Sequence, residues 1–246
     1  KYVVGTNFLS VVGLAALDVD GDGWVDFVCS GVWYRNTGNP RKEPFERVVF
    51  DPNAAGAHDI VAADMDGDGR QDIVMMGDER TKVNSLRCYN IPADPRKPWQ
   101  SHWIGPPVHG AITPNGIFDV DGDGDLDVLR ADAWFENKDG RGREWVPHAN
   151  IPFGRKGPYG VCVRTAAADL DGDGKPEIIM VDADITDGKA AILPTQDKGQ
   201  TWQKQELPQS FPYGSMHSLA VADFNGDGRP DIFVNEQEDL LPKGRQ

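Results

Sequence analysis

Short runs of β-branched and aromatic residues, four to seven long, alternate along this chain with stretches rich in Gly, Pro, Asn and Asp. Runs of this kind, bounded by turn-forming residues, are typical of β-strands. The region from residue 58 to 104 contains four of them, "HDIVAAD", "DIVMM", "SLRCYN" and "WQSHWI". No segment sustains the 3.6-residue apolar period of an amphipathic helix. The pattern therefore predicts an all-β fold with very little helix.

One eleven-residue polar pattern recurs five times, and each copy leads directly into an apolar run. The first copy is "DVDGDGWVDFV", and the copies begin at residues 18, 64, 119, 169 and 223, so that the period is 46 to 55 residues. A fixed period of this length indicates a repeat protein. Four short strands in each repeat match the blade of a β-propeller. We predict a single β-propeller domain over residues 1–246.

The repeated pattern has the chemistry of a site for a hard cation. In the first copy Asp18, Asp20 and Asp22 alternate, so a tight loop can turn all three carboxylates towards one point. Gly23 supplies the positive φ that lets the chain reverse there, and Asp26 closes the site from the next strand. A cage of oxygens suits Ca²⁺, which accepts six to eight of them, better than Mg²⁺, which demands a stricter octahedron. No His or Cys lies in the pattern, which argues against zinc.

An EF-hand is the obvious alternative, and the twelfth position excludes it. An EF-hand loop needs a bidentate Glu twelve residues from its first Asp. Here that position holds Cys29, Met75, Arg130, Met180 and Val234. The last carboxylate stands instead at the ninth position, and the residues after it predict a strand and not a helix.

We therefore predict up to five calcium sites, with ligands at the first, third, fifth, seventh and ninth positions of each copy. The seventh residue contributes its backbone carbonyl. The predicted ligands are Asp18, Asp20, Asp22, Trp24 and Asp26; Asp64, Asp66, Asp68, Arg70 and Asp72; Asp119, Asp121, Asp123, Asp125 and Asp127; Asp169, Asp171, Asp173, Lys175 and Glu177; and Asp223, Asn225, Asp227, Arg229 and Asp231.

The motif "DxDGDGxxD" followed by an apolar strand resembles the FG-GAP/VCBS repeat of integrin α-subunits and many bacterial extracellular proteins. This resemblance covers nearly the whole chain and implies propeller blades that hold calcium between their first and second strands. It is specific for fold and metal and poorly specific for activity. Two departures are mild: Glu177 replaces Asp in the fourth copy, and Asn225 replaces Asp in the fifth. The fifth site is expected to bind calcium more weakly because it has lost one negative charge.

The register at the chain ends leaves the number of blades open. Alignment of the first two copies places "KYVV" opposite "RVVF", the fourth strand of a blade. This first strand can complete the last blade and close a ring of five. The alternative is that the chain is part of a larger ring, for which the family resemblance implies seven blades. The second alternative is favoured, because the last copy is followed by no recognisable third strand.

Composition and charge limit the classes of partner. The net charge is −14, and five calcium ions would cancel ten of these charges, so the acidity is mostly metal ligation. This balance argues against nucleic acid as a partner. The three cysteines show no repeat-equivalent pairing, and no signal peptide or membrane-spanning run is present. Calcium loops of this kind are filled where calcium is millimolar, so we expect a secreted, periplasmic or cell-surface protein that does not insert into a membrane.

The loops at the blade ends opposite the calcium loops are the expected ligand face. The longest, "ANIPFGRKGPYG", places two cations between aromatic rings. His58 and His217 each lie six residues before the first ligand of a copy and are therefore equivalent; a zinc site made of both is not expected, because their blades are not adjacent. The candidate ligand-binding residues are His58, His109, Arg155, Lys156, Tyr159, Tyr213 and His217.

Three classes of function fit this sequence. The first is a non-catalytic module that binds a glycan or a protein, and it is the favoured one. The second is an enzyme, a polysaccharide lyase or sugar dehydratase that uses a His or Tyr base on the loop face. The third is a purely structural surface or assembly protein. No paired nucleophile and base, no second metal motif and no phosphate-binding loop is recognisable, so no catalytic residue is assigned.

Overall fold

The computed structural model describes residues 4, 12–77, 85–210 and 212–237, and the statements below refer to these residues. Most of the predicted outer strand "KYVV" lies outside them. By internal contacts the chain forms two compact units, one of residues 1–107 and 137–145 and the other of residues 108–136 and 146–246. The expectation of one propeller domain over the whole chain stays a prediction.

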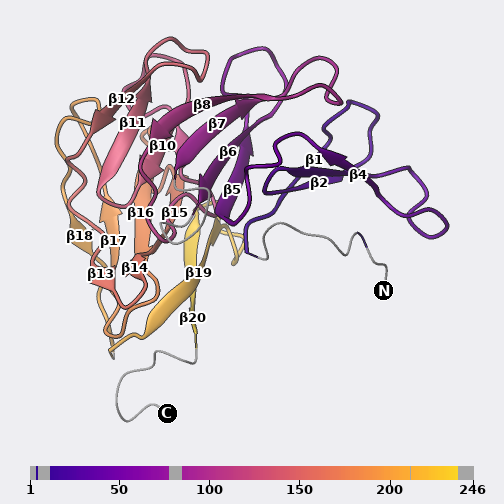
Figure 1. Cartoon of the computed structure of the whole chain (residues 1–246). Coiled ribbons are helices and arrows are strands. Elements are labelled where there is room, and N and C mark those ends of the chain that lie inside the picture. The colour runs from indigo at the N-terminus through magenta and orange to yellow at the C-terminus, as the bar shows by residue number, and fades with distance from the viewer. Residues whose placement is uncertain (1–3, 5–11, 78–84, 211, 238–246) are drawn as a thin grey trace. The chain divides into compact units, whose positions relative to one another are not determined.

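The first unit contains two four-stranded antiparallel sheets whose strands follow one another in chain order (Figure 1). The first sheet consists of β1 (Ala15–Leu17), β2 (Asp26–Cys29), β3 (Val32–Arg35) and β4 (Glu46–Val49). The second consists of β5 (Ala57–Ala63), β6 (Asp72–Gly77), β7 (Leu86–Asn90) and β8 (Gln100–Gly105). The second sheet matches the four runs predicted between residues 58 and 104, and the prediction of four-stranded blades is confirmed.

The remaining strands repeat the same arrangement. A third sheet, in the order β12-β11-β10-β9, consists of β9 (Ile117–Phe118), β10 (Asp127–Arg130), β11 (Ala133–Asn137) and β12 (Trp145–His148). A fourth consists of β15 (Val163–Ala168), β16 (Glu177–Asp182), β17 (Ala190–Leu193) and β18 (Gln205–Glu206). Two further pairs are β13 (Lys156–Gly157) with β14 (Gly160–Val161), and β19 (Ser215–Ala222) with β20 (Asp231–Gln237).

The described residues contain no helix, which confirms the all-β prediction. None of their segments is a helix that could cross a membrane. The calcium-type loops join β1 to β2, β5 to β6, β9 to β10, β15 to β16 and β19 to β20. Because the strands are antiparallel, the loops after the second strand and after the fourth strand of a sheet lie at its opposite end.

Within each unit, the core lies between the sheets. In the first unit Trp33, Tyr89 and Phe50 are buried, and the Phe50 and Trp99 rings stack with centroids 3.8 Å apart. In the second unit Trp134, Leu129 and Met180 are buried in one cluster. The aromatic pairs of the third strands, Trp33 with Tyr34 and Trp134 with Phe135, are no more than 2% exposed. These aromatic side chains therefore pack in the core and are not available to a ligand.

Candidate calcium centres

Two glycines give each acidic loop its shape. In the first loop Gly21 and Gly23 have φ values of 72° and 88°, in the left-handed region that side chains with Cβ resist. The paired glycines of the other four loops have φ between 72° and 100°. A Cβ on these glycines would meet no neighbouring atom, so backbone conformation, not space, requires glycine. This confirms the role predicted for Gly23.

The first aspartate of every loop is held by the same backbone bond. Its Oδ2 atom accepts a hydrogen bond from the N–H of the second glycine, as Gly23 donates to Asp18 at 2.8 Å. The equivalent distances in the other loops are 2.9, 3.0, 3.0 and 2.8 Å. The bond fixes the position of one carboxylate in each loop before any ion binds.

Carboxylate oxygens converge in four of the loops. Within each of four groups, one oxygen from every residue lies within 4.8 Å of the others; the groups are Asp18, Asp20 and Asp22; Asp64, Asp66 and Asp72; Asp119, Asp121 and Asp127; and Asp169, Asp171 and Glu177. Hard, anionic oxygens are the ligands that Ca²⁺ prefers. These residues therefore fit the predicted ion, whereas ligation by the remaining predicted residues, including the seventh-position carbonyls, stays a prediction.

The residue at the ninth position of the motif also forms hydrogen bonds that connect the loop to the third strand of the blade, as the first two blades show. Asp26 is fully buried and accepts hydrogen bonds from the Trp33 indole at 2.9 Å and the Asn36 N–H at 2.6 Å. In the second blade Asp72 accepts from the Ile91 N–H at 2.8 Å. The sequence predicted a metal ligand at this position, but the bonds to the third strand depend on strand pairing and could not be read from the motif.

Burial and crowding of the loop carboxylates raise the free-energy cost of ionising them. Burial raises the pKa of Asp72 to about 6, and the charges of Asp66 and Asp68 add to this effect. Burial also raises the pKa of Asp125 to about 6, with Asp123 as the next cause. A bound divalent cation would reverse both effects, because an adjacent positive charge favours the ionised carboxylate.

The first loop already has a positively charged neighbour. Arg35, at the end of β3, contacts Asp20 and lies 2.6 Å from an oxygen of Asp22. The equivalent residue at the end of β7 is the neutral Asn90, whose amide lies 3.1 Å from Asp72. A calcium ion in the first loop must therefore compete with a guanidinium for the same carboxylates, a difference between the blades that the repeated motif does not reveal.

Replacement of one loop ligand should remove one ion. We expect Asp66→Ala to lower the calcium stoichiometry by one and to destabilise mainly the second blade, because the oxygens of Asp64 and Asp72 alone make a poorer cage. Asn225→Asp should tighten the fifth site by restoring a carboxylate. Isothermal titration calorimetry with calcium-stripped protein measures both effects. An unchanged stoichiometry in Asp66→Ala would show that this loop is not a calcium site.

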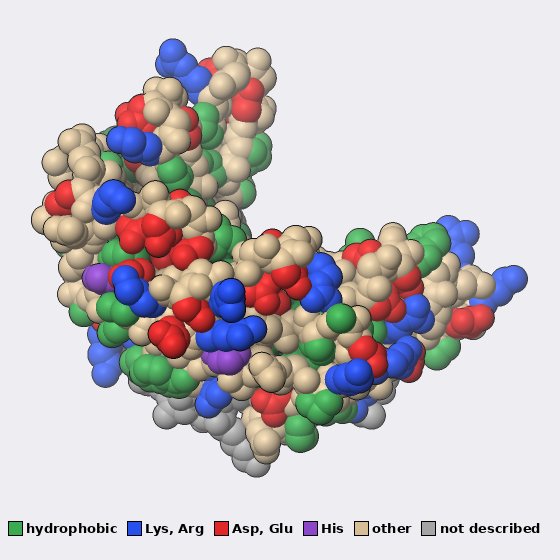
Figure 2. Space-filling model, turned by 90° about the horizontal axis from the view of Figure 1, so that it is seen from above, with side chains coloured by type: hydrophobic (Ala, Val, Ile, Leu, Met, Phe, Trp, Pro, Cys, Tyr) green, Lys and Arg blue, Asp and Glu red, His purple; other side chains and the backbone are tan. Residues whose placement is uncertain are grey.

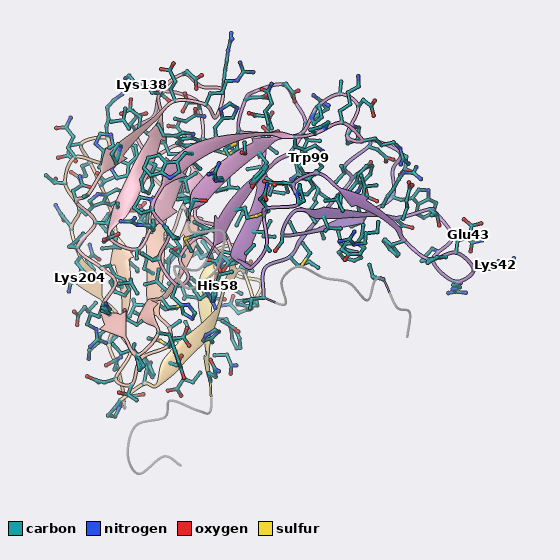
Figure 3. All side chains as sticks on the ribbon, viewed as in Figure 1. Lys42, Glu43, His58, Trp99, Lys138 and Lys204 are labelled. Carbon is teal, nitrogen blue, oxygen red and sulfur yellow. The ribbon has the colours of Figure 1, made fainter. Side chains whose placement is uncertain are left out.

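The candidate residues of the ligand face are distributed over both units. In the first unit His58, labelled in Figure 3, lies near the start of β5 at a β-bulge, and its Nδ1 is 2.8 Å from Asp59. Both side chains are buried. In the second unit His217 occupies the equivalent bulge in β19, which agrees with the equivalence inferred from spacing.

The two cations of the longest loop differ in their surroundings. The Arg155 guanidinium donates to the buried carboxylate of Asp182 at 2.8 Å and also contacts the Asp187 carbonyl oxygen. Arg155 is thus held by an ion pair within the unit. Lys156 is exposed in β13, and Tyr159, between β13 and β14, is 45% exposed with its ring 6.0 Å from that of His109. Tyr213 is half-buried and packs against the apolar cluster that includes Met216.

His109 and His217 converge on Asp184, a residue that no sequence pattern marks. Their Nε2 atoms lie 3.3 and 3.1 Å from the two oxygens of this buried carboxylate. Burial alone would raise the pKa of Asp184, but hydrogen bonds from His109, His217 and Cys162 outweigh it and hold the pKa well below its usual range. The three residues are far apart in sequence, and no motif connects them.

Comparison with known proteins agrees with this geometry. The profile of the FG-GAP-like repeat matches residues 18–75, 119–180 and 169–234. The chain belongs to the FG-GAP-like repeat family. The matched segments contain all five acidic loops, so the FG-GAP-like repeats of this chain are the four-stranded sheets and the β19–β20 pair described above. No curated protein sequence matches the chain.

Solved structures resemble this FG-GAP-like chain at low sequence identity. The Vibrio cholerae biofilm matrix protein Bap1 is 20% identical, with a TM-score of 0.50, over 85% of this chain and 30% of its own. The Tc holotoxin pore of Photorhabdus luminescens is 19% identical (TM-score 0.47, 93% and 11% covered), and the exotype rhamnogalacturonan lyase YesX 17% (TM-score 0.45, 89% and 48% covered). The chain spans less than half of each of these proteins, and the likeness to Bap1 concerns the fold alone.

Proposed function

We propose that this chain is an extracellular, calcium-stabilised propeller module that binds a glycan or a protein on the loops opposite its calcium loops. The acidic loops support the extracellular setting, because weak all-oxygen sites are filled where calcium is millimolar. Bap1 is named as a biofilm matrix protein, which is a setting of the same kind.

The proposal rests on the exposed hairpin formed by β13 and β14. Lys156 and Tyr159 lie there at the end of the second unit away from the calcium loops, with their side chains exposed. A tyrosine offers both an apolar ring and a hydroxyl to a partner, and a lysine offers a charge-assisted hydrogen bond to an anionic group. An acidic sugar or an acidic protein segment fits this pair.

The distribution of charge supports a partner other than nucleic acid. On the face seen in Figure 2, acidic and basic side chains are interleaved, and no broad basic patch is visible. Nucleic-acid binding requires a basic stripe or patch on one face. With a net charge of −14, the chain also lacks the overall balance expected for that function.

A binding assay with a matched control tests the proposal. A glycan array and a pull-down identify a ligand, and Lys156→Ala combined with Tyr159→Ala should weaken its binding at least about tenfold, since two direct contacts are lost. The control is Lys42→Ala, which removes an exposed lysine from the first unit and should bind the ligand as the wild type does. Calcium content and melting temperature should be unchanged in the double variant. Equal affinity in wild type and double variant would refute binding through this hairpin.

The same ligands distinguish the other two classes of function. Incubation with acidic polysaccharides should produce no ultraviolet absorbance from unsaturated sugars, because binding alone breaks no bond. An increase in that absorbance would replace the binding module with a lyase. The absence of any ligand in the array and in the pull-down would favour a purely structural role.

A further inference from the structure

A cluster of side chains in the second unit has a composition unlike that of the calcium loops. Asp184, 8% exposed at its side chain, lies between the Nε2 atoms of His109 and His217 and accepts a hydrogen bond from Cys162. One ligand atom each from Cys162, Asp184 and His217 lies within 4.8 Å of the others. The cluster thus brings a thiol, a carboxylate and one imidazole together, and the His109 imidazole contacts the other oxygen of the same carboxylate.

Backbone bonds hold this cluster in place. Cys162 accepts through its carbonyl oxygen from the Ala183 N–H at 2.9 Å, which ties it to the residue before Asp184. The Asp184 N–H donates to the Ser215 hydroxyl at 2.7 Å, and Asp184 has a φ of 54°. The N–H of His109 donates to the Val161 carbonyl at 2.9 Å. The β-bulge at His217 turns that side chain out of the regular alternation.

We propose that Cys162, Asp184 and His217 form a zinc site in which a water completes the tetrahedron and His109 holds the second oxygen of Asp184. The site is separate from the calcium loops and from the proposed ligand hairpin. Zinc binds thiolate, imidazole and carboxylate ligands in tetrahedral four-coordinate sites. Calcium prefers an all-oxygen set, so the two kinds of site in this chain select different ions. A bound zinc would connect Cys162, directly before β15, with the loop after β16 and with β19.

The hydrogen bonds of His217 define the proton changes on binding. A guanidinium can only donate, so the contact of Arg164 with Nδ1 at 3.1 Å makes Nδ1 an acceptor and leaves the ring proton on Nε2, facing Asp184. Zinc would bind Nε2, and the ring proton would move to Nδ1. The contact between Nδ1 and Arg164 would then be lost. Arg164 keeps its bond to the His217 carbonyl oxygen at 3.1 Å. Cys162 binds as a thiolate, and its proton leaves to solvent.

Cobalt(II) is the probe, because it binds at zinc sites and its absorbance spectrum depends on its ligands. Protein saturated with calcium, so that the acidic loops are filled, is titrated with Co²⁺. We expect one equivalent to produce the near-ultraviolet thiolate-to-cobalt charge-transfer band and the strong visible bands of tetrahedral cobalt. Addition of zinc should then displace cobalt and abolish the charge-transfer band and the visible bands. No charge-transfer band in the wild type would overturn the proposal.

Two cysteine variants identify the thiolate. Cys162→Ser should abolish the charge-transfer band, whereas Cys88→Ser, which alters another buried thiol outside any disulfide, should leave the band intact. A band that persists in Cys162→Ser would overturn the assignment. If Cys162→Ser does not fold, His217→Gln, at a side chain 30% exposed, provides the second test. It should weaken cobalt binding at least about tenfold, and unchanged affinity would contradict the site.

Replacement of Arg164 distinguishes a metal site from a cluster that is held only by hydrogen bonds. In Arg164→Gln the amide oxygen can accept from the metal-bound His217 at Nδ1, the usual role of a partner behind a zinc-bound histidine. We therefore expect cobalt to bind up to about tenfold more tightly to this variant. Weaker binding in a variant that retains its melting temperature would contradict the proton changes described above.

Discussion

Removal of calcium is expected to lower the melting temperature of this protein by on the order of 15 °C or more. An ion that binds only the folded state adds about 2.7 kcal/mol at each site when its concentration is about 100 times Kd. In a chain of this size, about 1 kcal/mol corresponds to roughly 2–4 °C. Four loops bring carboxylates together, so even three occupied sites produce the expected shift. Differential scanning calorimetry with and without EDTA measures it.

The specificity of the effect needs its own control. Restoring calcium after EDTA should recover the original melting temperature, whereas the same excess of magnesium should recover only part of it, because magnesium keeps more of its water and tolerates fewer protein oxygens. A melting curve that EDTA leaves unchanged would contradict the central role assigned to the acidic loops.

Local patterns predicted the fold and the geometry of the acidic loops well. The apolar runs gave β5 to β8 nearly residue by residue, because strand pairing and burial both act on alternating β-branched side chains. The positive φ of the loop glycines followed from the reversal that the alternating aspartates require. Both features depend on residues within about ten positions of one another, and short patterns contain that information.

Contacts between distant segments could not be predicted. Arg35 reaches the first loop across 15 residues, and Arg155 pairs with Asp182 across 27. Both contacts depend on how strands and loops come together. In each, a cation that the sequence alone leaves available to a ligand pairs instead with a carboxylate of the chain. The cluster around Asp184 joins four segments, and only His109 and His217 were singled out from sequence, without their common partner.

Asp72→Asn is expected to change stability in opposite directions with and without calcium. The folded protein raises the pKa of Asp72 to about 6, mainly through burial. A carboxylate whose pKa is raised binds its proton more tightly when folded. Its ionisation therefore costs nothing below about pH 4, and the cost grows as the pH rises towards 6 and persists at neutral pH. Two pKa units correspond to about 3 kcal/mol.

In EDTA at pH 7.5, Asp72→Asn should therefore stabilise the protein, by up to about 2 kcal/mol, because the buried charge is gone. The asparagine Oδ1 can still accept from the Ile91 N–H. The Asn90 amide nitrogen, which donates to Asp72 in the wild type, must exchange places with its Oδ1, and this Oδ1, which has no partner among the described residues, then accepts from the new amide. At pH 4 the gain should disappear, since wild-type Asp72 is then protonated.

In calcium the sign of the stability change should reverse, because the second loop loses an anionic ligand. Urea unfolding in four conditions, two pH values with and without calcium, measures these differences. Destabilisation by Asp72→Asn in EDTA at pH 7.5 would show that the cost of the buried Asp72 charge is not what calcium relieves in this loop.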